Sequence, residues 1–162
     1  MKLRTLVVVA GATLVLYGSV NPAAFQGTAA PPVRMISITV GDPVGEKMEY
    51  SRKQIVATPG ERLRIRIFSQ GQMPKTVMAH NWVLLTLGAD AQKFADAAAP
   101  AVATDYMPPA LKHQVLAATT LVGPGERAEV TFTVPKVRGT YPYLCTFAGH
   151  YAAGMRGDLL VK

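Results

Sequence analysis

Three residues near the C-terminus carry side chains that bind soft metal ions. In the segment CTFAGHYAAGM, the only cysteine of the chain, Cys145, is followed by His150 and then by Met155, with four residues in each interval. A thiolate, an imidazole nitrogen and a thioether together suit copper, which alternates between a softer reduced and a harder oxidised state. The spacing therefore predicts that one loop supplies three ligands to a copper ion.

A copper site of this kind needs a second histidine, and two further histidines are available. His80 lies in KTVMAHNWVLLTL, at the start of an apolar run of strand length, whereas His113 lies in PPALKHQVL between proline-rich and basic neighbours. We expect His80 to bind the metal and His113 to have no metal role. Two histidines and a cysteine in one plane, with a long axial methionine, form the blue-copper arrangement.

The first 32 residues have the composition of an export signal. Lys2 and Arg4 precede an uncharged apolar run over residues 6–20, and the small-residue segment NPAAFQGTAAPP follows it. The run is shorter than the roughly 20 residues that span a membrane. We therefore predict a cleaved signal peptide, with Ala24 and Ala29 as candidate cleavage positions, ahead of a retained membrane tether. Either form predicts an exported protein, in the periplasm or at the outer face of the cytoplasmic membrane.

Export also bears on the single cysteine. In an oxidising compartment cysteines usually pair as disulfides, and one unpaired thiol is exposed to oxidation or wrong pairing unless something occupies it. A bound metal would occupy Cys145, which agrees with the copper prediction.

Length and charge limit the remaining function classes. The chain has 162 residues, of which 49% are hydrophobic, and this suits one compact domain over residues 33–162. The net charge is +7 and becomes +5 without Lys2 and Arg4. The basic residues are scattered, and in GERLRIRIF they alternate with apolar residues, as on the wet face of a strand. We therefore expect no nucleic-acid partner.

Short strands separated by turns must position the predicted ligands. Apolar and polar residues alternate in MISITV, LRIRIF and AEVTFTV, and shorter apolar runs occur in HNWVLLTL, PYLCTF and GDLLVK. This pattern predicts an all-β sandwich with antiparallel and mixed pairing, whose loops converge at one end. The alanine-rich segment GADAQKFADAAAPAVATDY differs, because Asp90 can cap a short helix there. One face of that helix would carry Ala91, Phe94, Ala95 and Ala98.

Three segments together resemble the azurin and plastocyanin group of cupredoxins. They are MAHNWVL, TTLVGPGERAEVTFTV and CTFAGHYAAGM, and the resemblance runs from about Ile36 to Lys162. It implies an eight-stranded Greek-key β-sandwich in which the short helical insert corresponds to the azurin flap. It also implies one type 1 copper ion and one-electron transfer.

Carried over by position, the resemblance implies a complete ligand set. The equatorial ligands would be His80, Cys145 and His150, with the Met155 sulfur as a weak axial ligand. The Ala79 carbonyl stands where azurins place a distant fifth oxygen. Asn81 would hydrogen-bond across to the thiolate loop, with Thr146 as its partner.

Two departures separate the chain from azurin itself. Four residues, 151–154, lie between His150 and Met155, where azurins usually have three, and this spacing is more similar to that of auracyanins. Azurins also carry a disulfide, which a chain with a single cysteine cannot form. The resemblance is therefore to an azurin-like or auracyanin-like protein, and the longer loop leaves the Ala79 contact open.

The expected function is electron transfer between redox proteins. A site held by the fold changes little between Cu(II) and Cu(I), and we expect the His150 ring edge to reach solvent inside a small apolar docking patch. The patch would comprise Phe147, Ala148, Tyr151, Ala152, Ala153, Val77 and Met78. Expected partners are a cytochrome or a membrane electron-transfer complex docking near His150, with the protein itself a monomer.

Three alternatives remain at the level of the sequence. The protein could store or deliver copper without transferring electrons, although a thiolate in a closed loop disfavours release. It could be an enzyme that uses a Cys145–His150 pair, but then Met155 would have no role and no oxyanion-hole motif is apparent. A metal-free adhesion sandwich is the third. Zn(II) could also fill such a site, so metal content alone does not identify the native ion.

Overall fold

The computed structural model describes residues 32–42 and 47–162, so the predicted signal peptide or tether lies outside the described residues. The described part contains eight strands, one α-helix and two short 3-10 helices. The strands are β1 (Val33–Val40), β2 (Gln54–Ala57), β3 (Arg62–Ser69), β4 (Val83–Leu85), β5 (Val115–Ala118), β6 (Arg127–Thr133), β7 (Gly139–Leu144) and β8 (Arg156–Val161). The helices are α1 (Ala91–Ala98), η2 (Val102–Thr104) and η3 (Pro109–Gln114). Within the described residues, no helix has the length and apolarity that crossing a membrane requires.

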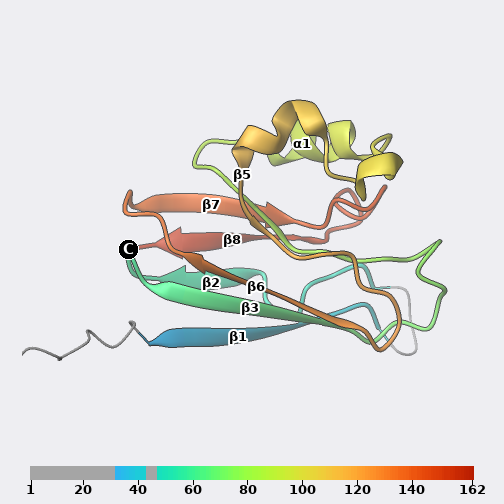
Figure 1. Ribbon diagram of the computed structural model, residues 1–162, viewed down its shortest axis with the longest axis horizontal. Coiled ribbons are helices and arrows are strands. Elements are labelled where there is room, and N and C mark those ends of the chain that lie inside the picture. Colours follow the sequence, from blue (N-terminus) through green and yellow to red (C-terminus); the bar gives the residue numbers. More distant parts are fainter. Residues whose placement is uncertain (1–31, 43–46) are drawn as a thin grey trace, which may run out of the picture. The chain divides into compact units, whose positions relative to one another are not determined.

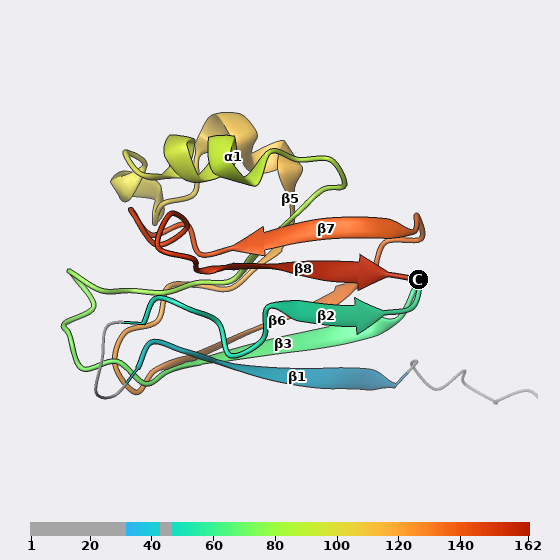
Figure 2. The same cartoon turned by 180° about the vertical axis from the view of Figure 1, so that it is seen from behind.

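The strands form two sheets, which confirms the predicted β-sandwich of about eight strands with a short helical insert (Figure 1). One sheet has the order β1-β3-β6 and the other has the order β2-β8-β7-β4-β5. The pairs β1–β3 and β2–β8 are parallel, and the remaining neighbours are antiparallel, as the expectation of mixed pairing requires. In the view from behind, the sheet that contains β2 and β8 lies above the sheet that contains β1 and β3 (Figure 2).

The core lies between the sheets and follows the alternation of the strands. In β3 the apolar side chains of Leu63, Ile65 and Ile67 are buried, while the intervening arginines lie on the other face. Arg64 and Arg66 pair there with Glu129 of β6. These arginines therefore form the wet face of a strand, as the sequence predicted.

The insert between β4 and β5 begins with the predicted helix. The Asp90 side chain accepts a hydrogen bond from the Lys93 backbone N–H at 3.0 Å, which satisfies one of the free N–H groups of the first turn. Phe94 and Ala98 are buried, and Phe94 forms a second apolar cluster with residues of β4 and β7. This cluster attaches the helix to the sheet that carries the predicted thiolate loop.

Several element boundaries differ from those expected. β4 is limited to Val83–Leu85, and its register shifts between Leu84 and Leu85, so most of the run HNWVLLTL is irregular. β7 ends at Leu144, which places Cys145 in the following loop. β2 and β5 were not expected, because a four-residue strand gives little alternation and alanine is a poor strand former. The helices η2 and η3 were not expected either.

Candidate metal centre

Two segments at one end of the sandwich bring the predicted ligands together (Figure 1). His80 precedes β4, while residues 145–155 form the loop between β7 and β8. β4 and β7 are hydrogen-bonded neighbours, and Val83 pairs with Leu144, so the two segments leave the sheet side by side. The pairing of these two strands therefore places His80 next to Cys145. Their immediate neighbours, Asn81 and Thr146, are 65 positions apart in the sequence.

Backbone hydrogen bonds hold each segment in place. The His80 N–H donates to the Val122 carbonyl at 2.9 Å, and the Val122 N–H donates back at 2.7 Å. At the base of the β7–β8 loop, the Cys145 N–H donates to the Met155 carbonyl at 3.1 Å. The Met155 N–H in turn donates to the His150 carbonyl at 2.9 Å. The four-residue intervals of the loop thus close into a compact turn with its ends adjacent.

The side chains of His80, Cys145 and His150 form a buried cluster. One donor atom from each lies within 4.8 Å of the other two, and the exposed fractions are 2%, 0% and 2%. The Cys145 Sγ lies 3.5 Å from His150 Nδ1, and the two imidazole rings are 4.9 Å apart between centroids. Met155 is fully buried in the same core as Cys145. By contrast, His113 is exposed in η3 and is not part of this cluster.

The electrostatics of the cluster favour a metal ligand set. Burial lowers the pKa of both His80 and His150 to about 4, and the neighbouring His80 contributes to the shift of His150. Both rings are therefore neutral near pH 7 and offer a lone pair. Burial raises the pKa of Cys145 to about 12, although the backbone N–H groups of Asn81 and Phe147 hydrogen-bond the sulfur and oppose the shift. Such a thiol is protonated near pH 7, and a metal ion that binds the sulfur would displace its proton.

Two buried side-chain nitrogens in the described part of the chain have no hydrogen-bond partner, and one of them belongs to the cluster. Among the described residues, His80 Nδ1 and Trp82 Nε1 are the buried side-chain nitrogen or oxygen atoms without a hydrogen bond. A buried polar atom of this kind usually has a partner, such as a water or an ion. Because His80 Nδ1 belongs to a residue of the cluster, a metal ion held there would supply the missing partner. The donor set and this unpaired nitrogen together fit copper.

Asn81 and Thr146 join the two segments directly behind the cluster. Asn81 Nδ2 donates to Thr146 Oγ1 at 2.8 Å, and the Thr146 backbone N–H donates to Asn81 Oδ1 at 2.9 Å. Both residues are buried. This reciprocal pair fixes the distance between the segments that carry His80 and Cys145.

We expect Asn81→Ala to destabilise the metal-free protein by about 2 to 4 kcal/mol, because it leaves two buried polar groups of Thr146 without partners. Urea unfolding followed by circular dichroism measures the change. The matched control is Gln92→Ala, which removes an exposed amide hydrogen bond to Asp96 and should cost less than about 0.5 kcal/mol. Equal, small changes in both variants would show that the pair does not hold the two segments together.

Two residues that support the cluster were missed by sequence reasoning. Tyr50 is buried, and its hydroxyl donates to the Asn81 carbonyl at 2.6 Å. Thr119 Oγ1 accepts the Trp82 backbone N–H at 3.0 Å. Both contacts fix the segment that follows His80. The one available signal was an aromatic residue in the mostly polar segment KMEYSRK.

An aromatic stack covers the cluster on the side of the insert. The ring of Tyr106 lies 4.6 Å from that of Phe147, which lies 4.8 Å from the His150 ring. His150 is only 2% exposed, so at most a small edge of its ring reaches solvent, because these neighbours enclose it. Of the predicted docking patch, Val77, Ala148, Ala152 and Ala153 are exposed and the other residues are partly buried.

Comparison with known proteins agrees with this site. The profile of the family described as copper binding proteins, plastocyanin/azurin family, matches residues 37–162. Azurin from Pseudomonas aeruginosa is 34% identical over 120 residues, which cover 72% of this chain and 92% of that protein. Auracyanin-A from Chloroflexus aurantiacus is 35% identical over 129 residues, which cover 78% and 75% of the two chains.

Solved structures give the same likeness. The structure of auracyanin A, described as a blue copper protein from Chloroflexus aurantiacus, superposes with a TM-score of 0.66 and 32% identity. The superposition covers 81% of this chain and 100% of that one. Auracyanin from Roseiflexus castenholzii, in its dithionite-reduced form, also gives a TM-score of 0.66, with 30% identity and coverage of 79% and 96%.

Proposed function

The chain belongs to the plastocyanin/azurin family of copper-binding proteins, and we propose that it carries single electrons between redox partners through one copper ion. We assign the ligands as His80, Cys145 and His150, with Met155 as the weak axial ligand. The buried cluster of two neutral imidazoles and a thiol, with His80 Nδ1 unpaired, is the observation that carries this proposal. When bound, copper supplies the one-electron chemistry by alternating between Cu(II) and Cu(I).

The protein's own contribution is a ligand set that stays in place in both oxidation states. Thiolate and thioether suit the reduced ion, whereas imidazole also suits the oxidised ion. The Asn81–Thr146 pair and the Tyr50 hydroxyl restrain the ligand segments from outside the cluster. Restrained ligands limit the rearrangement that accompanies electron transfer. We do not assign the Ala79 carbonyl as a ligand, because the interval between His150 and Met155 is longer than in azurins.

Burial of the cluster argues against the two alternative functions. A copper store or delivery protein has to release its ion, but Cys145 is fully buried beneath the loop that holds it. An enzyme with a Cys145 nucleophile would need an accessible thiolate, whereas burial raises the pKa of this thiol to about 12. We therefore propose no catalytic role.

The apolar surface above His150 is the proposed docking surface. Ala148, Ala152 and Ala153 are exposed in the β7–β8 loop, and Val77 is 54% exposed in the other segment. A small apolar area of this kind suits the brief contacts of redox proteins. We propose that a cytochrome or a membrane electron-transfer complex docks here and that the protein is a monomer without a nucleic-acid partner.

We further propose that residues 1–32 are a signal peptide or membrane tether and that residues 33–162 form the exported domain. Lys2 and Arg4 before an apolar run support this division, as does a family match that begins at residue 37. The proposed location is the periplasm or the outer face of the cytoplasmic membrane.

Ala153→Glu is expected to slow electron self-exchange of the copper-loaded protein by about tenfold, because two docking surfaces would then oppose like charges. Nuclear magnetic resonance line broadening in mixtures of oxidised and reduced protein measures this rate without a known partner. The control is Val137→Glu, at a position that is 61% exposed in the turn between β6 and β7. Absence of measurable self-exchange in the unaltered protein would contradict the carrier function. Equal slowing in both variants would argue against this docking surface.

A further inference from the structure

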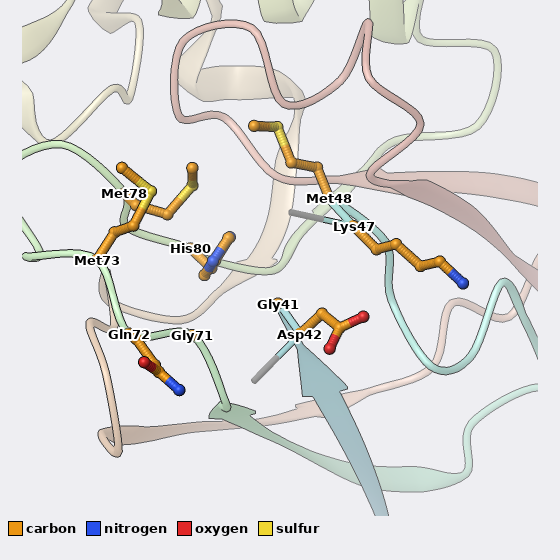
Figure 3. A pocket seen from close by; sticks show the side chains of 9 residues that line it. All are labelled: Gly41, Asp42, Lys47, Met48, Gly71, Gln72, Met73, Met78 and His80. Carbon is orange, nitrogen blue, oxygen red and sulfur yellow. The ribbon is translucent and has the colours of Figure 1, made fainter. Parts of the chain in front are cut away.

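Three of the chain's seven methionines line one pocket beside His80 (Figure 3). Met48, Met73 and Met78 lie around a pocket of about 40 Å³, with Gly41 and His80 also in its lining. Met48 precedes β2, whereas Met73 and Met78 belong to the segment between β3 and β4. The fold therefore brings together thioethers from two separate parts of the chain, and the assigned ligand set uses none of them.

His80 belongs both to this pocket and to the buried cluster. A Cβ atom at Gly41 would lie 3.4 Å from His80 Nε2 and 3.2 Å from the Gly71 backbone nitrogen. Nε2 therefore faces Gly41 and the pocket, which leaves Nδ1 for the cluster. Gly41 has a φ of +72°, a conformation that favours glycine, and glycine leaves the space beside the imidazole open. The His80 ring thus stands between an outer, thioether-lined space and the inner ligands.

The pocket can be reached from solvent, whereas the inner cluster cannot. Met73 is 42% exposed, and Met48 and Met78 are partly buried. Cys145 and Met155, by contrast, are fully buried. A copper ion must therefore pass a partly open surface before it reaches the thiol, and three methionines gather on such a surface next to His80.

We propose that Met48, Met73 and Met78 form an outer Cu(I) site that receives the ion before it enters the inner cluster past His80. Thioether sulfur is a soft ligand and selects Cu(I) over Cu(II). Methionine side chains are unbranched and flexible, so three of them can converge on an ion that arrives from solvent. The outer site lacks a thiolate, so it holds the ion more weakly than the inner cluster, and this difference sets the direction of transfer.

The transfer is a ligand exchange without a redox change. The Cu(I)–thioether bonds break, Cu(I)–thiolate and Cu(I)–imidazole bonds form, and the proton of the Cys145 thiol passes to water. The oxidation state stays Cu(I) throughout, so no oxidant or reductant is needed. Transfer to the inner cluster rests on the proposed copper centre, whereas binding at the outer site does not.

Leucine variants separate this proposal from a purely apolar role of the same methionines. Leucine has nearly the volume of methionine and keeps an apolar surface, but it has no sulfur. A surface that only contacts a partner protein would keep its function in Met48→Leu/Met73→Leu/Met78→Leu, whereas a Cu(I) site would be lost. Met35→Leu/Met107→Leu is the matched control, because these methionines lie on β1 and in the insert.

The test uses reduced, copper-loaded protein under anaerobic conditions, with Cu(I) buffered by a chromophoric chelator. We expect the unaltered protein and the Met35→Leu/Met107→Leu control to bind a second Cu(I), and the triple leucine variant to bind none. Met73→Leu alone, at the most exposed of the three positions, should weaken this second binding. A second Cu(I) that persists in the triple variant, or no second Cu(I) in the unaltered protein, would overturn the proposal.

A second experiment measures how fast the metal-free protein takes up copper, and it also tests the proposed copper centre. With Cu(I) supplied to the metal-free protein, followed by oxidation, the blue absorption should form about tenfold more slowly in the triple variant than in the control. With Cu(II) supplied instead, the two rates should be equal, because thioethers bind the harder ion poorly. Equal rates with Cu(I) would overturn the transfer step. Failure of every protein to turn blue would contradict the proposed centre, and the second-Cu(I) titration would still decide the outer site.

Discussion

Replacing Cys145 by serine is expected to lower the affinity for copper by more than about 100-fold. Loss of a residue that only hydrogen-bonds a metal ligand costs up to about 100-fold, and loss of the ligand itself should cost more. The substitution exchanges a soft sulfur for a hydroxyl oxygen, which binds Cu(I) poorly and stays protonated at neutral pH. The serine oxygen can still accept hydrogen bonds from the Asn81 and Phe147 N–H groups that contact the sulfur. The fold should therefore persist, and competition with a chelator measures the affinity.

Met155→Leu is the matched control for this prediction. The thioether is assigned as a weak axial ligand, so its loss should reduce copper affinity much less than loss of the thiolate. The blue colour should remain, and the reduction potential should rise, because an apolar axial neighbour disfavours the more charged oxidised state. If Cys145→Ser kept the affinity of the unaltered protein, the thiolate would not be a ligand. An unchanged potential in Met155→Leu would remove Met155 from the site.

Gly157→Ala is expected to destabilise the protein by at least about 3 kcal/mol, because the new methyl group has no room. Its Cβ would lie 2.5 Å from the Tyr143 hydroxyl oxygen and 2.6 Å from the Lys53 carbonyl oxygen. Tyr143 cannot move freely, since its ring is buried and its hydroxyl donates to the Arg52 carbonyl. Thermal or urea unfolding measures the loss.

The position of Gly157 connects this prediction to the metal site. Gly157 pairs with Tyr143 where β7 and β8 approach the loop that carries Cys145 and His150. Gly71→Ala is the control, because a Cβ there would meet its nearest atom, Ser69 Oγ, at 3.8 Å. It should change the free energy of unfolding by less than about 1 kcal/mol. If both variants lost a similar amount of unfolding free energy, the close packing around Gly157 would not be the cause of the destabilisation.

The clustering of His80, Cys145 and His150 could be predicted from sequence because its signal is largely local. The intervals within CTFAGHYAAGM place three soft or borderline donors on one short loop, and only loop spacing is needed to see this. The choice of His80 required one further observation, namely that it lies at the start of an apolar run of strand length. The long alternating strands, such as β1 and β3, were predicted for the same reason, since their pattern repeats over eight residues.

Contacts between distant segments could not be predicted in this way. Tyr50 reaches the Asn81 carbonyl across 31 positions, and Tyr106 reaches Phe147 from the insert, and neither contact leaves a periodic pattern. The near-complete burial of His150 follows from such contacts, so the sequence alone does not indicate it. The pocket between Met48 and Met73 likewise exists only once the fold has joined its two sides.

The spectrum of the copper-loaded protein tests the central claim most directly. One equivalent of Cu(II) is added to the metal-free protein, and its visible absorption and electron paramagnetic resonance spectra are recorded. A Cu(II) ion bound by the Cys145 thiolate and two imidazoles should give an intense blue thiolate-to-copper band with narrow parallel hyperfine splitting. A colourless complex, or one with the wide splitting of ordinary tetragonal Cu(II), would contradict the claim that His80, Cys145 and His150 together hold a type 1 copper ion.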